Sequence, residues 1–306
     1  MGVLAAPAVV RWRMPIAAGL TVLGLLLTLY LATIAASDGF AYDAHAYWLA
    51  DGYTRSADTP DAFVYSPPVL LLAQALHLIP WPVWLEVYEL AIGAGIWLLA
   101  GPLALVLVWT PQVASELTLA NIHIFLALVA VYGLRWPALW SFALLTKLTP
   151  GVGLLWFVAR GEWGKLAIAL GVTAAIVLPT VILRPDLWIG WVDMLAASSG
   201  SSGRIPLAVR LPVAAVLVIV AARKDWPWFV PVASMLALPI LWDVHGLSML
   251  LGVIPPVAHR LGLRYWPYPG RAVEVPNSPA PAEPPPSLAP QRRPTPSQGV
   301  DSTRLA

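Results

Sequence analysis

Residues 14–36 read MPIAAGLTVLGLLLTLYLATIAA, and they lead directly into SDGFAYDAHAYW at residues 37–48. The first stretch is apolar and reaches the roughly 20 residues that a helix needs to cross a bilayer. The second stretch places Asp43 just beyond the membrane boundary, among aromatic residues. An enzyme that acts on lipid-linked substrates would keep its base at such a position. These two stretches therefore predict a membrane helix followed by a loop with a candidate catalytic carboxylate.

The composition of the 306 residues is typical of a membrane protein. Only 11% of the residues are charged and 59% are hydrophobic, and the mean hydropathy is +0.74. A soluble chain has about 25% charged residues. The net charge of +2 is too small to indicate a nucleic-acid partner, and the lack of cysteine excludes disulfides, cysteine-based zinc sites and thiol nucleophiles. We expect an all-α polytopic membrane protein.

The positive charges predict the membrane topology. Arg11 and Arg13 precede the first span, so the positive-inside rule places residues 1–13 in the cytoplasm. The loop at 37–66 is rich in aspartate and carries one arginine, which suits the outer face. The apolar stretches predict about eight full spans, and the charges between them place both termini in the cytoplasm. These spans are expected at residues 14–36, 67–80, 83–109, 115–134, 166–183, 205–222, 226–242 and 246–261.

Two further segments complete the domain organisation. Residues 137–160 are interrupted by Lys147-Leu-Thr-Pro150, and proline disrupts a helix interior. We expect two half-helices there, which form a re-entrant hairpin with Lys147 deep in the membrane or near its outer side. Residues 263–306 are rich in Pro, Ala and Ser and predict a disordered cytoplasmic tail. The catalytic domain is therefore expected to be transmembrane and to span residues 14–262.

Polar residues near the membrane gather on the outer side in this topology. Ionisable groups at membrane depth are costly, so each is a functional candidate. Cations can hold a phosphate, and a carboxylate can take a proton from a hydroxyl group. The candidates are Asp43, His45, Tyr65, Glu116, Asn121, His123, Lys147, Arg204, Arg210, Asp243 and His245.

Several of these residues also have an ordinary structural interpretation. Asp43 could be a solvated loop acid, and Lys147 could extend its ammonium group to the interface. His123 lies in an apolar stretch, where a packed, hydrogen-bonded histidine is the favoured interpretation. Arg204 and Arg210 could anchor the chain at the interface. The residues alone leave these alternatives open.

Five short motifs follow one another along the chain. They are Asp43-Ala-His-Ala-Tyr47, Tyr65-Ser-Pro-Pro68, Asn121-Ile-His123, Lys147-Leu-Thr-Pro150 and Asp243-Val-His245. Their order resembles that of glycosyltransferase family 87, which comprises polyprenol-dependent mannosyltransferases of the GT-C class. The resemblance covers roughly residues 10–262 and implies a GT-C-like helical bundle.

The resemblance also implies an activity. It is the inverting transfer of a sugar, with mannose expected, from a polyprenyl-phosphate donor to a glycolipid or glycan acceptor. The reaction is expected at the outer face of the cell membrane, in cell-envelope biosynthesis. The cations could replace a metal at the leaving phosphate, so neither a metal nor a cofactor is expected. The carboxylates that could in principle bind a metal are Asp38, Asp43 and Asp243.

Roles for individual residues follow from the same resemblance. Asp43 and His245 are the implied catalytic residues: Asp43 deprotonates the acceptor hydroxyl, and His245 orients the acceptor or the donor. The residues implied to bind the donor phosphate are Lys147, Arg204 and Arg210. Those implied to bind the sugar or the acceptor are His45, Tyr47, Tyr65, Asn121 and Asp243.

Two other functions compete with this one. A transporter or lipid flippase could use the same polar residues as a substrate path, but alternating access needs polar gates on both membrane faces. The inner side offers mainly interfacial Arg and Lys, which argues against transport. A membrane scaffold that recruits partners through the Pro-rich tail is the third candidate, and removal of the residues after Arg264 would distinguish it from an enzyme.

Overall fold

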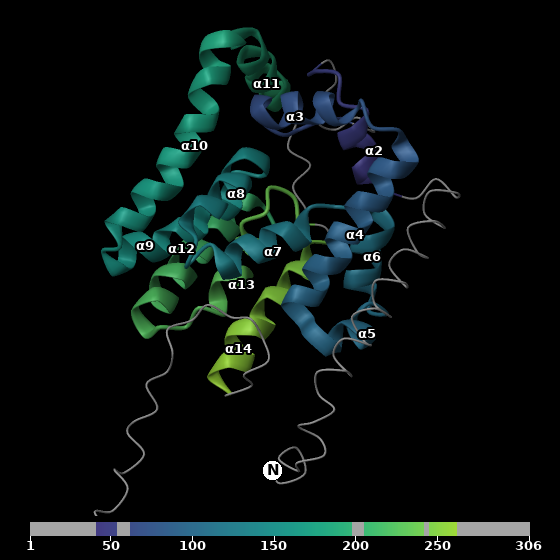
Figure 1. Cartoon of the computed structure of the whole chain (residues 1–306). Coiled ribbons are helices and arrows are strands. Elements are labelled where there is room, and N and C mark those ends of the chain that lie inside the picture. Colours follow the sequence, from purple (N-terminus) through teal and green to yellow (C-terminus); the bar gives the residue numbers. More distant parts are fainter. Residues whose placement is uncertain (1–40, 54–61, 198–204, 242–244, 262–306) are drawn as a thin grey trace, which may run out of the picture. The chain divides into compact units, whose positions relative to one another are not determined.

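The computed structural model describes residues 41–53, 62–197, 205–241 and 245–261, which form helices joined by turns (Figure 1). No strand occurs among these residues, in agreement with the all-helical prediction. All of them belong to one compact unit of the chain. The predicted first span, Arg204, Asp243 and the predicted tail lie outside the described residues.

The first half of the described chain contains mostly short helices. They are α2 (Tyr42–Trp48), α3 (Pro67–Leu76), α4 (Trp81–Ala100), η2 (Gly101–Leu103), α5 (Ala104–Leu107), α6 (Pro111–Leu119), α7 (His123–Tyr132), η3 (Pro137–Leu139) and α8 (Trp140–Thr146). The second half contains η4 (Thr149–Leu154), α9 (Leu155–Arg160), α10 (Trp163–Leu183), α11 (Pro185–Ala197), α12 (Leu207–Lys224), α13 (Phe229–Leu236), η5 (His245–Val253) and α14 (Ile254–Arg260).

Two described segments, Trp81–Leu107 and Trp163–Leu183, are long and apolar enough to cross a membrane. A third is added if α6 and α7 together form one bent span. In α10, large apolar side chains such as Leu178 and Ile182 are exposed instead of packing against the protein. An apolar helix with such a surface is suited to lipid, so these segments indicate a membrane protein. The predicted number of eight membrane spans stays a prediction.

Helix α7 occupies the centre of the packed helices, where it contacts α4, α8, α13 and η5 (Figure 1). Its sequence, HIFLALVAVY, is apolar on all sides, and most of its side chains are buried. A helix that is hydrophobic all round belongs in the interior of a bundle. His123, the first residue of α7, is therefore carried into the protein interior.

Helices α6 and α7 meet at a sharp bend of 114°, within the stretch where the sequence predicts one span. Ala120 ends α6 with φ 51° and ψ 55°, a left-handed conformation that costs an alanine about 1–2 kcal/mol. Two side chains stabilise the new helix start. Asn121 Oδ1 accepts a hydrogen bond from the Ile122 N–H at 2.7 Å, and Glu116 Oε1 accepts one from the Ile124 N–H at 3.2 Å. The bend brings Glu116, Asn121 and His123 close together.

A second break lies where Lys147-Leu-Thr-Pro150 predicts one. Helix α8 ends at Thr146, Leu148 adopts φ 42°, and the tighter helix η4 begins at Thr149. The break leaves Lys147 at the C-terminal end of α8. The re-entrant path across a membrane stays a prediction.

Charged side chains join α9, α10 and α12 at their ends. Glu162 accepts a hydrogen bond from Arg160 at 3.0 Å and another from Lys165 at 2.8 Å. Arg160 also pairs with Asp225, just beyond α12, at 2.8 Å. The sequence places Arg160 and Lys165 at the cytoplasmic boundary, and these ion pairs put them in one cluster.

Candidate functional site

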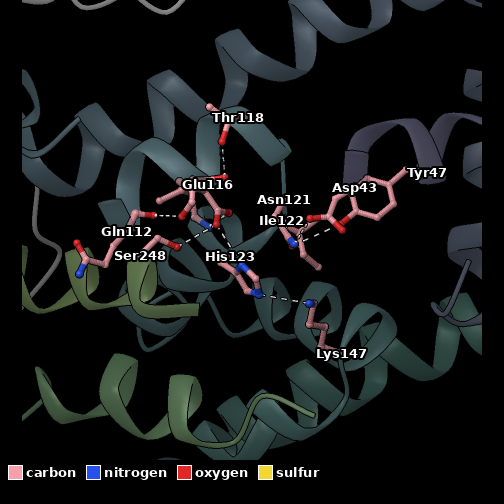
Figure 2. Close-up of polar contacts among 12 residues, drawn as sticks. Asp43, Tyr47, Gln112, Glu116, Thr118, Asn121, Ile122, His123, Lys147 and Ser248 are labelled. Atoms are coloured by element: carbon pink, nitrogen blue, oxygen red, sulfur yellow. Dashed lines mark hydrogen bonds and ion pairs between the residues drawn. The ribbon is translucent and has the colours of Figure 1, made fainter. Parts of the chain in front are cut away.

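The start of α2 positions Asp43 beside the bend between α6 and α7. Ala41 precedes the helix with φ 61°, and its N–H donates to the Thr118 carbonyl at 2.7 Å. Asp43 lies in the first turn of α2, and its Oδ2 accepts a hydrogen bond from Asn121 Nδ2 at 2.6 Å (Figure 2). Two motifs that are far apart in the sequence therefore meet at this carboxylate.

Two tyrosines extend this contact. Tyr47 lies one turn after Asp43 on α2, so both side chains emerge on the same face. The Tyr65 hydroxyl donates to the Tyr47 hydroxyl at 2.8 Å, and the Tyr47 hydroxyl donates to Asn121 Oδ1 at 3.4 Å. Since Oδ1 accepts and Nδ2 donates, the amide of Asn121 has a fixed orientation. Tyr65, Tyr47, Asn121 and Asp43 form one hydrogen-bonded chain.

Burial raises the pKa of the Asp43 carboxyl above its ordinary value of 3.8, and neighbouring groups only partly oppose this effect. The largest opposing effect comes from the positive charge of Lys147, and the next largest from the Asn121 hydrogen bond. Both favour the ionised form. Asp43 is thus a partly desolvated carboxylate whose affinity for a proton exceeds that of an exposed aspartate.

A second chain of contacts links Lys147 to His123, Glu116 and Ser248. Lys147 Nζ lies 3.3 Å from His123 Nε2, and His123 Nδ1 lies 3.1 Å from Glu116 Oε2 (Figure 2). The Ser248 hydroxyl donates to the same Glu116 oxygen at 3.0 Å. His123, Glu116 and Ser248 are almost completely buried. The site therefore combines a carboxylate that can accept a proton with an ammonium group that can hold an anion.

The family model of glycosyltransferase family 87 matches residues 63–267, which is more than half of the chain. The chain belongs to glycosyltransferase family 87. No curated protein and no solved structure matches it. Family membership identifies a glycosyltransferase, which requires a sugar donor and an acceptor.

The matched range contains Tyr65, Asn121 and Lys147 of the site and begins after Asp43. The structure joins the two parts, because Asn121 from the matched range holds Asp43. Asp43, the candidate base, precedes the range that matches the family and is in contact with it.

The remaining predicted site residues in the described part of the chain are His45, His245 and Arg210. His45 lies two positions from Asp43 on α2, which directs it to another face of the helix. Its ring contacts the Trp81 ring edge-on, with 5.0 Å between the ring centroids. His245 begins η5, and only its backbone is described. Among the described residues, no group of three or more His, Asp or Glu could hold a metal ion.

Arg210 is held by backbone carbonyls near the end of α13. Its guanidinium group donates to the carbonyls of Ile205, Leu236, Leu238 and Pro239, at distances of 2.6 to 3.2 Å. These bonds occupy four of the five N–H groups of an arginine. Arg210 thereby ties the start of α12 to the chain after α13, and one N–H is left for another acceptor.

Glu116 and His123 are functional candidates by sequence because they are ionisable residues in an apolar stretch, but the sequence predicts no specific role for either. Their seven-residue spacing predicts two turns of one continuous helix, and the bend at Ala120 changes that geometry. Their contact with Lys147 could therefore not be predicted.

Proposed function

We propose that this glycosyltransferase moves a sugar, expected to be mannose, from a polyprenyl-phosphate donor to a hydroxyl of a glycolipid or glycan. The reaction inverts the anomeric configuration and takes place at the extracytoplasmic face of the cell membrane. The observation that carries the proposal is the bend between α6 and α7, where Asn121 holds the partly buried carboxylate of Asp43 and His123, two residues further on, contacts the ammonium group of Lys147. Family membership supplies the reaction class, and the apolar helices suit lipid-linked substrates.

Each group has one task in the proposed reaction. Asp43 removes the proton of the acceptor hydroxyl while that oxygen attacks the anomeric carbon from the face opposite the phosphate. The bond between the anomeric carbon and the phosphate oxygen breaks, and its electron pair leaves with the polyprenyl phosphate. Lys147 stabilises the negative charge that develops on this leaving group.

The remaining residues bind the substrates in this proposal. The hydroxyls of Tyr47 and Tyr65 and the Asn121 amide bind the sugar or the acceptor, next to the base. Arg210 offers its remaining N–H to the donor phosphate. The roles of His45, Arg204, Asp243 and His245 rest on the family resemblance alone.

The direct test is transfer by the purified full-length protein in detergent. The donor is radiolabelled polyprenyl-phosphate mannose, and the acceptor is a crude lipid extract. Label that enters a new lipid with the native protein, and not with the protein omitted, supports the proposal. Label that stays in the donor in the presence of folded protein contradicts the proposed donor.

We further propose that about eight spans form a GT-C-like bundle with both termini in the cytoplasm. The chain has no cysteine, so a single introduced thiol reports its own location. Asp51→Cys is expected to react with a membrane-impermeant maleimide in intact cells, since Asp51 is exposed in the predicted outer loop. Lys224→Cys, at the exposed last residue of α12 and beyond the predicted span at 205–222, should react only after permeabilisation. The reverse labelling pattern contradicts the proposed orientation.

The hydrogen bond from Asn121 predicts a change in pH dependence. Asn121→Ala removes a group that lowers the pKa of Asp43, so this pKa rises further. The base is active when ionised, and activity is lost as the pH falls through the pKa. The acidic limb of kcat/KM is therefore expected to move to higher pH. Activity near neutral pH is expected to fall about 10-fold for a separate reason, because the variant also loses the amide proposed to bind the sugar or the acceptor. Profiles for the native protein and the variant measure the shift, and an unmoved acidic limb argues against Asp43 as the titrating base.

A further inference from the structure

Glu116 is a buried carboxylate with a complete set of partners. It is fully buried, and its two oxygens accept hydrogen bonds from the Ile124 N–H and the Ser248 hydroxyl and contact His123 Nδ1. A buried charge is costly unless it is hydrogen-bonded in this way. The carboxylate is thus a fixed negative charge next to one nitrogen of the imidazole.

The contacts of His123 define its tautomer. A lysine ammonium group has donors and no acceptor, so Lys147 donates its hydrogen bond to Nε2 of His123. Nε2 must then carry the lone pair, and the proton of a neutral imidazole lies on Nδ1. That proton is donated to Glu116, which accepts it. The buried carboxylate of Glu116 therefore fixes the imidazole, and the imidazole in turn fixes the position of the Lys147 ammonium group.

We propose that Glu116 and His123 are positioning residues that hold the Lys147 ammonium group in place for the donor phosphate. The inference rests on the proposed function of Lys147 as a phosphate ligand. One N–H of Lys147 is directed at His123 Nε2, which leaves two for phosphate oxygens. A catalytic group held in place by hydrogen bonds from neighbouring residues needs no reorganisation when charge develops on the leaving group.

The backbone supports the same geometry. Lys147 follows the last residue of α8, and the next residue, Leu148, adopts a positive φ of 42°. Such a conformation is unfavourable for a leucine and persists where the surroundings impose it. A lysine that merely extended to the membrane interface would turn its ammonium group to water. Here the ammonium group turns to the buried imidazole (Figure 2).

Binding of a polyprenyl phosphate, the proposed leaving group, tests the inference with purified full-length protein in detergent. His123→Asn keeps a donor for Glu116 and lacks an acceptor at the position of Nε2, so we expect about 10-fold weaker binding. His123→Gln places an amide oxygen within reach of Lys147 and is expected to bind within about 3-fold of the native protein. This rescue by glutamine is not expected if His123 only fills space.

A double-mutant cycle with Lys147→Met separates positioning from packing. If His123 acts through Lys147, His123→Asn has no further effect in the Lys147→Met background. An effect of equal size in both backgrounds, or native binding by His123→Asn, overturns the inference. In either case weak binding by Lys147→Met alone leaves the proposed function intact. If the native protein binds no polyprenyl phosphate, the proposed donor and the inference both fail.

If His123→Asn lowers the thermal unfolding midpoint in detergent, its weaker binding could come from a loss of stability. Two further variants then test the inference. Glu116→Gln can donate to Nδ1, which permits the opposite tautomer and directs an N–H at Lys147. It is expected to weaken binding about 10-fold. Ser248→Ala removes one hydrogen bond of Glu116 but keeps the carboxylate and the tautomer, so it is expected to weaken binding less than Glu116→Gln does. Equal binding by Glu116→Gln and Ser248→Ala contradicts the inference.

Discussion

Asp43→Asn is expected to reduce sugar transfer by about 10²- to 10⁴-fold, the contribution typical of a general base. Asparagine has nearly the same shape as aspartate, and its side-chain oxygen can still accept the hydrogen bond from Asn121. The variant should therefore keep its fold while it loses the group that takes the acceptor proton. Initial rates of transfer measure the loss, and the thermal unfolding midpoint in detergent checks the fold.

Asp51→Asn is the matched control for this experiment. Asp51 lies in the same predicted outer loop and is exposed, whereas Asp43 is partly buried in contact with Asn121. We expect Asp51→Asn to transfer sugar at close to the native rate. If Asp43→Asn keeps more than a tenth of the native rate while folded, Asp43 is not the base and another acceptor of the proton must be sought.

Much of the helical architecture could be predicted from the sequence, because long apolar runs bounded by charges have few other solutions in a membrane. The predicted span at 166–183 corresponds to α10, Trp163–Leu183, and the span at 205–222 to α12, Leu207–Lys224. Helix α11 was not predicted. It packs near α3, and its Trp191 indole donates to the Val64 carbonyl at 3.1 Å, a long-range contact that no local pattern indicates.

The site could be predicted only in its parts. The sequence predicts a loop around Asp43, whereas the structure has helix α2 there, and the helix brings Asp43 and Tyr47 to one face. The proline after Lys147 does predict the break that leaves this lysine at a helix end. The contact between Asp43 and Asn121 depends on the left-handed Ala120, and alanine gives no signal for that conformation. The hydrogen-bond partners of Arg210 could not be predicted either, because they are backbone carbonyls and not side chains.

Lys147→Met is expected to lower kcat/KM for transfer by about 10²- to 10³-fold, the cost typical of removing one group that stabilises developing charge. Methionine has a similar length and is apolar, so the variant removes the ammonium group with little change in volume. Lys147→Arg restores a cation with a different shape and should recover part of the lost rate. Lys224→Met, an exposed position at the end of α12, is the control expected to act at the native rate.

The charge of Lys147 also acts on Asp43, so the same variant has a second effect that distinguishes the site from a surface lysine. Loss of the ammonium group removes the largest influence that favours ionised Asp43, and the pKa of Asp43 rises. The acidic limb of the residual activity should therefore move to higher pH in Lys147→Met and stay in place in Lys224→Met. A lower rate with an unmoved limb would separate Lys147 from the base, and native kcat/KM in Lys147→Met would remove it from the donor site.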